Sequence, residues 1–320
     1  MSLPVESARL TTPIADTSYR NYDGPLHRGG LRWWIIARMM VRNAFSRRPF
    51  WVLGFMCVLP YLKTGFGMYL LDQMQRLPTG VGQLLQKPTY AGYFYDAFGG
   101  FGGAEFWLYL LALLVGAGSI AGDNRANALQ IYLSKPITRG DYLLGKWLGI
   151  FVPVAAASAL PAVILYVYGL ISFHENGFFS QERDLPFRVL ACTLAPAVLH
   201  ASLLLGISAW MKRPVMAGGI YAAIYSGSTV VAQILGVLFM RRDEDLARTL
   251  GALSPPGALV GLAKHVYGHE DTIFGFFISN RQADPGRPDL WPLLALLLLC
   301  CFGGVVLARM RVRAVEVIQG

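Results

Sequence analysis

One stretch of this chain has the spacing of a nucleotide-binding loop. Gly140, Gly145 and Lys146 match the P-loop pattern, in which backbone N–H groups and a lysine hold phosphate. The next position is Trp147, where a P-loop carries Ser or Thr to bind Mg²⁺. The segment also opens an apolar helical stretch instead of following a strand. We therefore interpret the match as chance and expect any ATP to be bound by a separate chain.

The histidines and cysteines do not form the pattern of a metal or redox site. His265 and His269 have helical i, i+4 spacing, but no third ligand lies nearby, so a solvated pair in a loop is favoured. All four cysteines lie in apolar stretches, where they pack as small hydrophobic residues: Cys57, Cys192, Cys300 and Cys301. We expect no acidic residue deep in an apolar stretch, which leaves an intramembrane enzyme without catalytic carboxylates.

The elements that carry these residues have the composition of a membrane protein. Hydrophobic residues make up 54% of the chain, its mean hydropathy is +0.44, and only 15% of residues are charged. A soluble domain has about 25% charged residues. At about 1.5 Å per residue, six apolar stretches are long enough to cross a hydrocarbon core of about 30 Å. These stretches are 50–71, 105–122, 142–171, 187–211, 215–240 and 290–310.

The sequence therefore predicts an all-α integral membrane fold with six transmembrane helices in one domain, residues 49–313. Polar tails, residues 1–28 and 314–320, flank this domain. The longer polar stretches inside it, about 72–104 and 241–289, are interpreted as outer loops, because each is too short to bury a core of its own.

The distribution of Lys and Arg predicts the orientation, because basic residues are retained in short cytoplasmic loops. With the amino terminus inside, fifteen basic residues from Arg28 onward face the cytoplasm against three acidic ones, whereas the outer loops hold ten basic and thirteen acidic residues. We expect a multi-pass protein of the plasma (inner) membrane with both termini cytoplasmic. The membrane surface then accounts for the net charge of +9, and nucleic-acid binding is not needed to explain it.

Residues 29–48 are predicted to form an amphipathic helix at the membrane interface. One face of this helix is apolar and the opposite face carries arginines, which suits the headgroup layer. The residues expected to contact this layer are Trp33, Trp34, Arg38 and Arg42.

The loop between the second and third apolar stretches is predicted to contain a short helix, a break and the start of the next helix. Either Asp123 or Asn124 can cap the short helix, and the residue before Pro136 is pushed out of the helical region. Thr138 and Asp141 have the spacing of a capping box that opens the third span. Such a loop would be joined rigidly to two spans and could push on a partner.

This loop resembles the cytoplasmic signature of ABC type-2 exporter permeases. In that signature an acidic residue and Gly-Thr-Leu precede Leu-Ser-x-Pro-Ile-Ser-Arg and then Gly-Lys. The matching residues here are Asp123, Leu129, Leu133, Ser134, Pro136, Ile137, Arg139, Gly145 and Lys146. Thr138 replaces the family Ser, and Asn127-Ala128 replace the usual Gly-Thr. The six spans, the amphipathic first helix and Ser254-Pro255-Pro256 in the last outer loop also fit the family.

The resemblance implies a permease subunit that works with a second copy or homologue and with two separate ABC ATPase subunits. ATP and Mg²⁺ would bind to those ATPases, and this chain would hold no cofactor. The loop would act as a coupling helix docked in a groove of each ATPase, through Asp123, Arg125, Leu129, Tyr132, Leu133, Ser134, Lys135, Pro136 and Arg139. The complex would export a hydrophobic or amphipathic molecule.

Lys63 and His200 are the polar residues expected at membrane depth, where they could line a translocation path. The alternatives are that Lys63 extends to the outer headgroups and that His200 makes a hydrogen bond between helices. Besides membrane lipids as partners, two other functional classes stay open: an intramembrane enzyme and a structural membrane subunit without transport.

Overall fold

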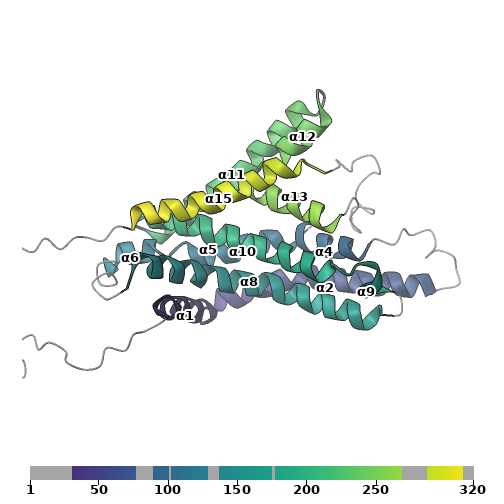
Figure 1. The fold of residues 1–320 in the computed structure, drawn as a ribbon, viewed down its shortest axis with the longest axis horizontal. Helices are drawn as coiled ribbons and strands as arrows, with labels where there is room; N and C mark the ends of the chain where they lie inside the picture. The colour runs from purple at the N-terminus through teal and green to yellow at the C-terminus, as the bar shows by residue number, and fades with distance from the viewer. Residues whose placement is uncertain are drawn as a thin grey trace, which may run out of the picture. The chain divides into compact units, whose positions relative to one another are not determined.

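The long apolar stretches of the sequence form helices in the computed structural model, which describes residues 31–76, 89–100, 102–128, 137–174, 177–268 and 287–312. Within these ranges the regular elements are all α-helices (Figure 1). They are α1 (Arg32–Phe45), α2 (Arg48–Arg76), α4 (Tyr90–Gly99), α5 (Ala104–Gly116), α6 (Ala121–Arg125), α8 (Arg139–Ser172), α9 (Phe178–Gln181), α10 (Leu185–Trp210), α11 (Pro214–Phe239), α12 (Glu244–Gly251), α13 (Pro255–Tyr267) and α15 (Leu290–Arg311).

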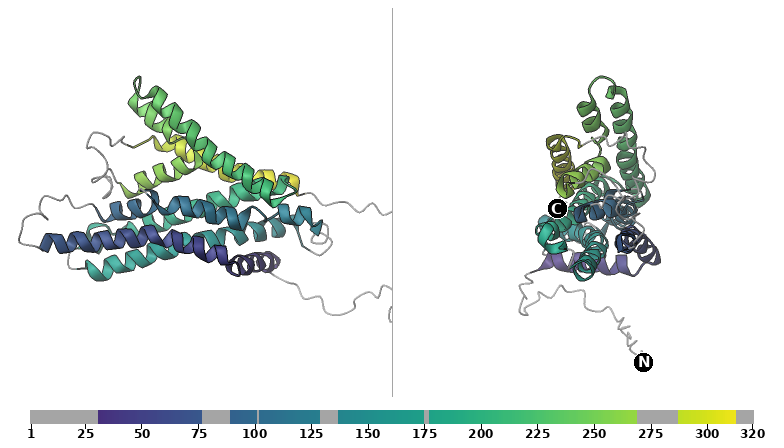
Figure 2. Two further views of the ribbon diagram at one scale, coloured as in Figure 1. Left: turned by 180° about the vertical axis from the view of Figure 1, so that it is seen from behind. Right: turned by 90° about the vertical axis from the view of Figure 1, so that its right-hand side faces the viewer.

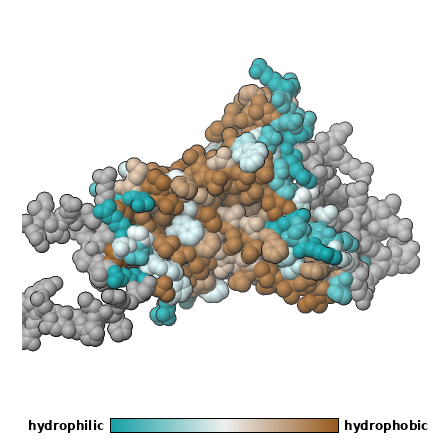
Figure 3. Space-filling model, viewed as in Figure 1, coloured by the Kyte–Doolittle hydropathy of each residue, from teal (hydrophilic) through white to brown (hydrophobic). Residues whose placement is uncertain are grey.

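Six helical segments are long and apolar enough to cross a membrane, which confirms the predicted all-α membrane fold. Their limits are Arg48–Met74, Ala104–Arg125, Arg139–Ser172, Leu185–Trp210, Pro214–Phe239 and Leu290–Arg311, each end within about three residues of the prediction. Helix α2 continues through Pro60 and Lys63 without a break. The surface between the two ends of these helices is mostly apolar, as a surface in contact with lipid must be (Figure 3).

A buried helix precedes the second span, in a stretch that the sequence analysis assigns to an outer loop. Every residue from Tyr90 to Phe98 in α4 is buried, and α4 packs against α2 and α13. Glycines separate α4 from α5: Gly102 has a φ of +66°, and a Cβ on Gly100 would lie 2.6 Å from the Asp96 carbonyl oxygen. Gly100 ends α4 and Gly103 begins α5, so these glycines let the chain change direction between the two helices.

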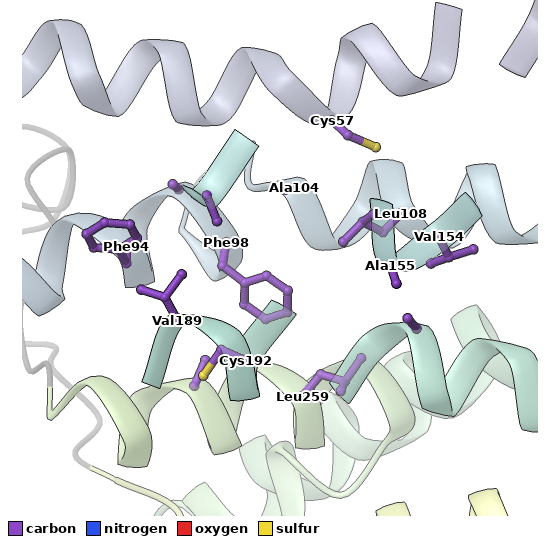
Figure 4. Close-up of a cluster of buried hydrophobic side chains, with 14 of the residues drawn as sticks. Cys57, Phe94, Phe98, Ala104, Leu108, Val154, Ala155, Val189, Cys192 and Leu259 are labelled. Carbon is purple, nitrogen blue, oxygen red and sulfur yellow. The ribbon is translucent and has the colours of Figure 1, made fainter. Parts of the chain in front are cut away.

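The core forms where α2, α4, α5, α8, α10 and α13 meet. Figure 4 shows side chains from these helices converging: Cys57, Phe94, Phe98, Leu108, Val154, Val189, Cys192 and Leu259. Helix α10 is central to this arrangement because it packs against α5, α8, α13 and α15. Small residues bring α10 and α15 together, and a Cβ on Gly206 would lie 2.6 Å from the Gly304 carbonyl oxygen. Such close backbone approach is typical of helix pairs in membranes.

Helix α1 is amphipathic as predicted, and its apolar face is covered by the chain itself. It lies crosswise to the long helices and packs against α8 (Figures 1 and 2). A Cβ on Gly145 would lie 2.7 Å from the Ile36 Cβ, and a Cβ on Gly149 would lie 2.7 Å from the Met40 Cβ. Trp34 stays exposed. No surface for this helix to pack on is evident from the sequence, and the glycines of α8 provide one.

Candidate functional site between the second and third spans

An ion pair joins the end of the second span to the start of the third. The Lys146 Nζ lies 2.6 Å from the Asp123 Oδ2, and the Tyr142 hydroxyl donates to the same oxygen at 2.6 Å. The Lys146 side chain is 4% exposed and that of Asp123 is 17% exposed. A buried ammonium without its carboxylate partner would be strongly destabilising, so this pair fixes α6 against α8.

Main-chain groups around α6 are bound to the end of α10. The backbone N–H groups of Ile120 and Ala121 donate to the Ser208 Oγ at 3.0 and 2.9 Å. The Asn124 side-chain amide donates to the Met211 carbonyl oxygen at 3.0 Å. These bonds satisfy donors that the irregular start of α6 leaves open. The beginning of the segment is therefore attached to α8 and α10 together.

Asp123 and Asn124 lie inside α6, and neither of them caps it. The N-cap position of α6 is Ile120, which has no side-chain capping bond. The short helix that Asp123 or Asn124 is predicted to cap follows α6 and lies mostly outside the described residues. The two side chains instead make the contacts to α8 and α10 described above. After α6 the backbone turns at Asn127, whose φ of 51° is left-handed. Asn tolerates this conformation better than most residues, and Asn127 stands where the signature described above has Gly.

The far end of the segment is a capping box, as predicted. The Thr138 Oγ1 accepts a hydrogen bond from the Asp141 backbone N–H at 3.1 Å, and the Thr138 N–H donates to the Asp141 Oδ2 at 3.2 Å. This reciprocal pair starts α8. Arg125 and Arg139 are exposed near the two ends of the segment.

The remaining predicted coupling residues lie outside the described residues: Leu129, Tyr132, Leu133, Ser134, Lys135 and Pro136. The P-loop-like match falls on the first turns of α8, where Lys146 is bound to a carboxylate. Among the residues that the structure describes, no group of three or more His, Cys, Asp or Glu side chains is placed to bind a metal ion. His265 contacts the Pro288 carbonyl oxygen at 2.5 Å, and His269 lies outside the described residues.

Lys63 faces a carboxylate that the sequence analysis does not pair with it. The Lys63 Nζ lies 3.4 Å from the Asp96 Oδ2, and the Asp96 side chain is 1% exposed. This contact joins α2 to α4. It differs from the alternative in which Lys63 extends to the outer headgroups. The sequence offered one signal for this pair: Asp96 is the only carboxylate in the aromatic stretch 90–99. A buried carboxylate of this kind needs a cation as its partner.

His200 is fully buried and bonded between two helices. Its Nδ1 lies 2.6 Å from the Tyr221 hydroxyl of α11. One turn further along α11, the Tyr225 hydroxyl donates to the Glu105 carboxylate, and the Tyr109 ring stacks on the Tyr225 ring at 4.7 Å. Tyr225 lies near the middle of α11, whereas Glu105 is the second residue of α5, at the start of the second span.

Comparison with known proteins gives one family match. The model of the "ABC-2 family transporter protein" family matches residues 34–254, from α1 to Ser254, the N-cap of α13. Among curated proteins, none matches this chain. The match covers more than half of the chain and includes the whole segment between the second and third spans. This chain therefore belongs to the family of ABC-2 type transporter permeases.

Proposed function

We propose that this chain is the transmembrane permease subunit of an ATP-driven exporter of a hydrophobic or amphipathic molecule. Membership of the ABC-2 family supports a transporter permease that works with ABC ATPase subunits. The proposal adds direction and coupling: two separate ATPases hydrolyse ATP with Mg²⁺, and this chain performs no catalytic step. The segment between the second and third spans is the coupling element.

The observation that carries the proposal is the attachment of this segment at both ends. Asp123 fixes its beginning to α8, and Asn124 fixes it to the end of α10. At its far end the capping box makes it continuous with α8. A partner that displaces the segment therefore displaces two spans, and α10 also packs on α15. Networks of packed and hydrogen-bonded elements of this kind carry energetic coupling between distant sites.

The rest of the complex follows from the same proposal. The segment and both termini face the cytoplasm of a plasma-membrane protein, where the ATPases can reach it. A second permease copy or homologue completes the translocation path. Helices α11 and α15 leave many large apolar side chains exposed in the single chain, which provides surface for this second copy and for lipid. Lys63 and His200 are partnered within the chain, which favours structural roles for both.

The deciding experiment replaces two apolar residues of the segment by acidic ones, Leu129→Asp and Leu133→Asp together. If these side chains contact the ATPase, the double variant buries unpaired charge there, at several kcal/mol. We expect the permease to insert and fold but to lose its ATPase subunits on co-purification from membranes. Transport-coupled ATP hydrolysis in reconstituted vesicles should fall to the background rate.

The matched control is the double variant Leu129→Met with Leu133→Met, which keeps both side chains apolar and of similar size. It should retain the ATPases. Stoichiometric ATPase subunits and normal activity in the acidic variant would show that this segment is not the coupling element.

A further inference from the structure

A cavity of about 370 Å³ lies between α1, the start of α2, α5 and α8. Its walls combine thioether, aromatic and aliphatic groups with charged and amide side chains. The lining residues used below are Arg47, Phe50, Leu114, Val115, Ser119 and Asp123. This cavity is separate from the contacts that attach the coupling segment to α10.

The polarity of the cavity changes from the end of α5 to α6. Leu114 and Val115 form its apolar part, Ser119 follows one turn later, and Asp123 with its partner Lys146 lies at the end nearest α6. Phe50 adds an aromatic wall from α2. A ligand that fits this gradient has a polar group at one end and a hydrocarbon chain at the other.

Ser119 provides an independent sign of a ligand. Its side chain is 4% exposed, and its Oγ has no hydrogen-bond partner among the residues that the structure describes. A buried hydroxyl without a partner is destabilising by about 1–3 kcal/mol, so buried polar atoms in proteins are nearly always bonded. Ser119 is one of the residues that line the cavity, so a ligand oxygen bound there could give this hydroxyl a partner.

The charge around the cavity selects an anion. Arg47 lines the cavity, is exposed, and forms no ion pair with any described residue. Lys146 and Asp123 balance each other, which leaves the positive charge of Arg47 uncompensated. Guanidinium groups bind phosphate through several N–H donors in a fixed geometry. The polar end of the ligand is therefore expected to carry phosphate.

We propose that this cavity binds one anionic phospholipid of the membrane leaflet in which α1 lies. The phosphate contacts Arg47 and the Ser119 hydroxyl, and the upper part of one acyl chain lies along Leu114, Val115 and Phe50. Helix α1 forms one wall of the site, so the lipid would hold this crosswise helix against α8. The proposal does not rest on ATP coupling or export, because lipid binding requires only the membrane-inserted permease.

The test measures lipid retained by the purified full-length permease. Protein equilibrated with phosphatidylglycerol or phosphatidylcholine in detergent is analysed by native mass spectrometry. We expect one phosphatidylglycerol per chain and little phosphatidylcholine. The double variant Arg47→Gln with Ser119→Ala should retain phosphatidylglycerol about tenfold less well, as expected for a lost charge-assisted hydrogen bond. Arg48→Gln, which removes the neighbouring charge outside the cavity, is the control and should bind as the unchanged protein does.

Three results would overturn the proposal: equal retention of the two lipids, undiminished binding by the double variant, or an equal loss in Arg48→Gln. Recovery of a different phosphate-bearing amphiphile from native membranes, in preference to phosphatidylglycerol, would assign the cavity to a transported molecule and also contradict it. Should the double variant fail to fold, the comparison of the two lipids on the unchanged protein decides the question.

Discussion

The two members of the ion pair between Lys146 and Asp123 differ in burial, so we expect their replacement to affect stability differently. Lys146 is almost fully buried, whereas Asp123 reaches solvent and also accepts a bond from Tyr142. Asp123→Asn removes the carboxylate that lies 2.6 Å from this buried ammonium, and we expect a loss of about 3–5 kcal/mol. Lys146→Met leaves only a partly solvated carboxylate and should be milder. Thermal unfolding of the purified permease in detergent measures both effects.

The double variant Asp123→Asn with Lys146→Met completes a double-mutant cycle for this ion pair. It should be more stable than Asp123→Asn alone, because the buried cation has been removed. Arg125→Gln, at an exposed position in the same helix, should leave stability unchanged. Unchanged stability in Asp123→Asn would show that the pair does not fix α6 to α8.

The sequence identifies the members of these contacts more readily than their pairing. Asp123 and Lys146 both belong to the signature of the loop, but their contact depends on how α6 meets α8. Asp96 and Lys63 are likewise far apart in the chain and meet only when α4 packs on α2. The capping box of Thr138 was predictable because it spans a single helical turn, where spacing alone fixes the geometry.

At the scale of elements, the contact between α10 and α15 depends on one glycine of a neighbouring pair. A Cβ on Gly304 would collide with the Ser202 carbonyl oxygen, whereas a Cβ on Gly303 meets nothing within 4 Å. We expect Gly304→Val to separate the two helices and to lower stability by about 1–3 kcal/mol or more, as overpacking does. The readout is the fraction of permease that stays monodisperse in detergent on heating.

Gly303→Val is the matched control, because it adds the same atoms on the open side of the same helix. It should behave as the unchanged protein does. Equal sensitivity at both positions would mean that helix propensity, and not the close approach to α10, explains the effect.

Apolar length predicts the six spans because a membrane imposes a minimum of about 20 residues on a single crossing helix. The same criterion misses α4, which has 10 residues and contains Asp96. Its burial comes from neighbouring helices, and a broken helix of this kind leaves only a weak hydropathy signal. The surface of α8 on which α1 packs could not be predicted from the sequence for a related reason. Gly145 and Gly149 allow another helix to approach α8 closely, but only the folded structure shows that this helix is α1.

On the scale of the whole molecule, the balance of charges sets the expected orientation in the membrane. From Arg28 onward, fifteen basic and three acidic residues are expected on the side of the coupling segment, against ten basic and thirteen acidic residues on the other side. The same orientation is needed for ATPases to reach the segment. Orientation and function are therefore tested together by asking which side of the membrane each loop faces.

Single cysteines at Ala126 and Ser180 make this test, since both positions are exposed and lie beyond opposite ends of α8. In intact cells a membrane-impermeant maleimide should label Ser180→Cys and leave Ala126→Cys unlabelled. The reason is that basic residues keep the loop that contains Ala126 in the cytoplasm. Permeabilised cells should show labelling at both. The unchanged protein is the background control, because its four cysteines lie within membrane-spanning helices. Labelling of Ala126→Cys in intact cells would invert the orientation and place the segment out of reach of any cytoplasmic ATPase.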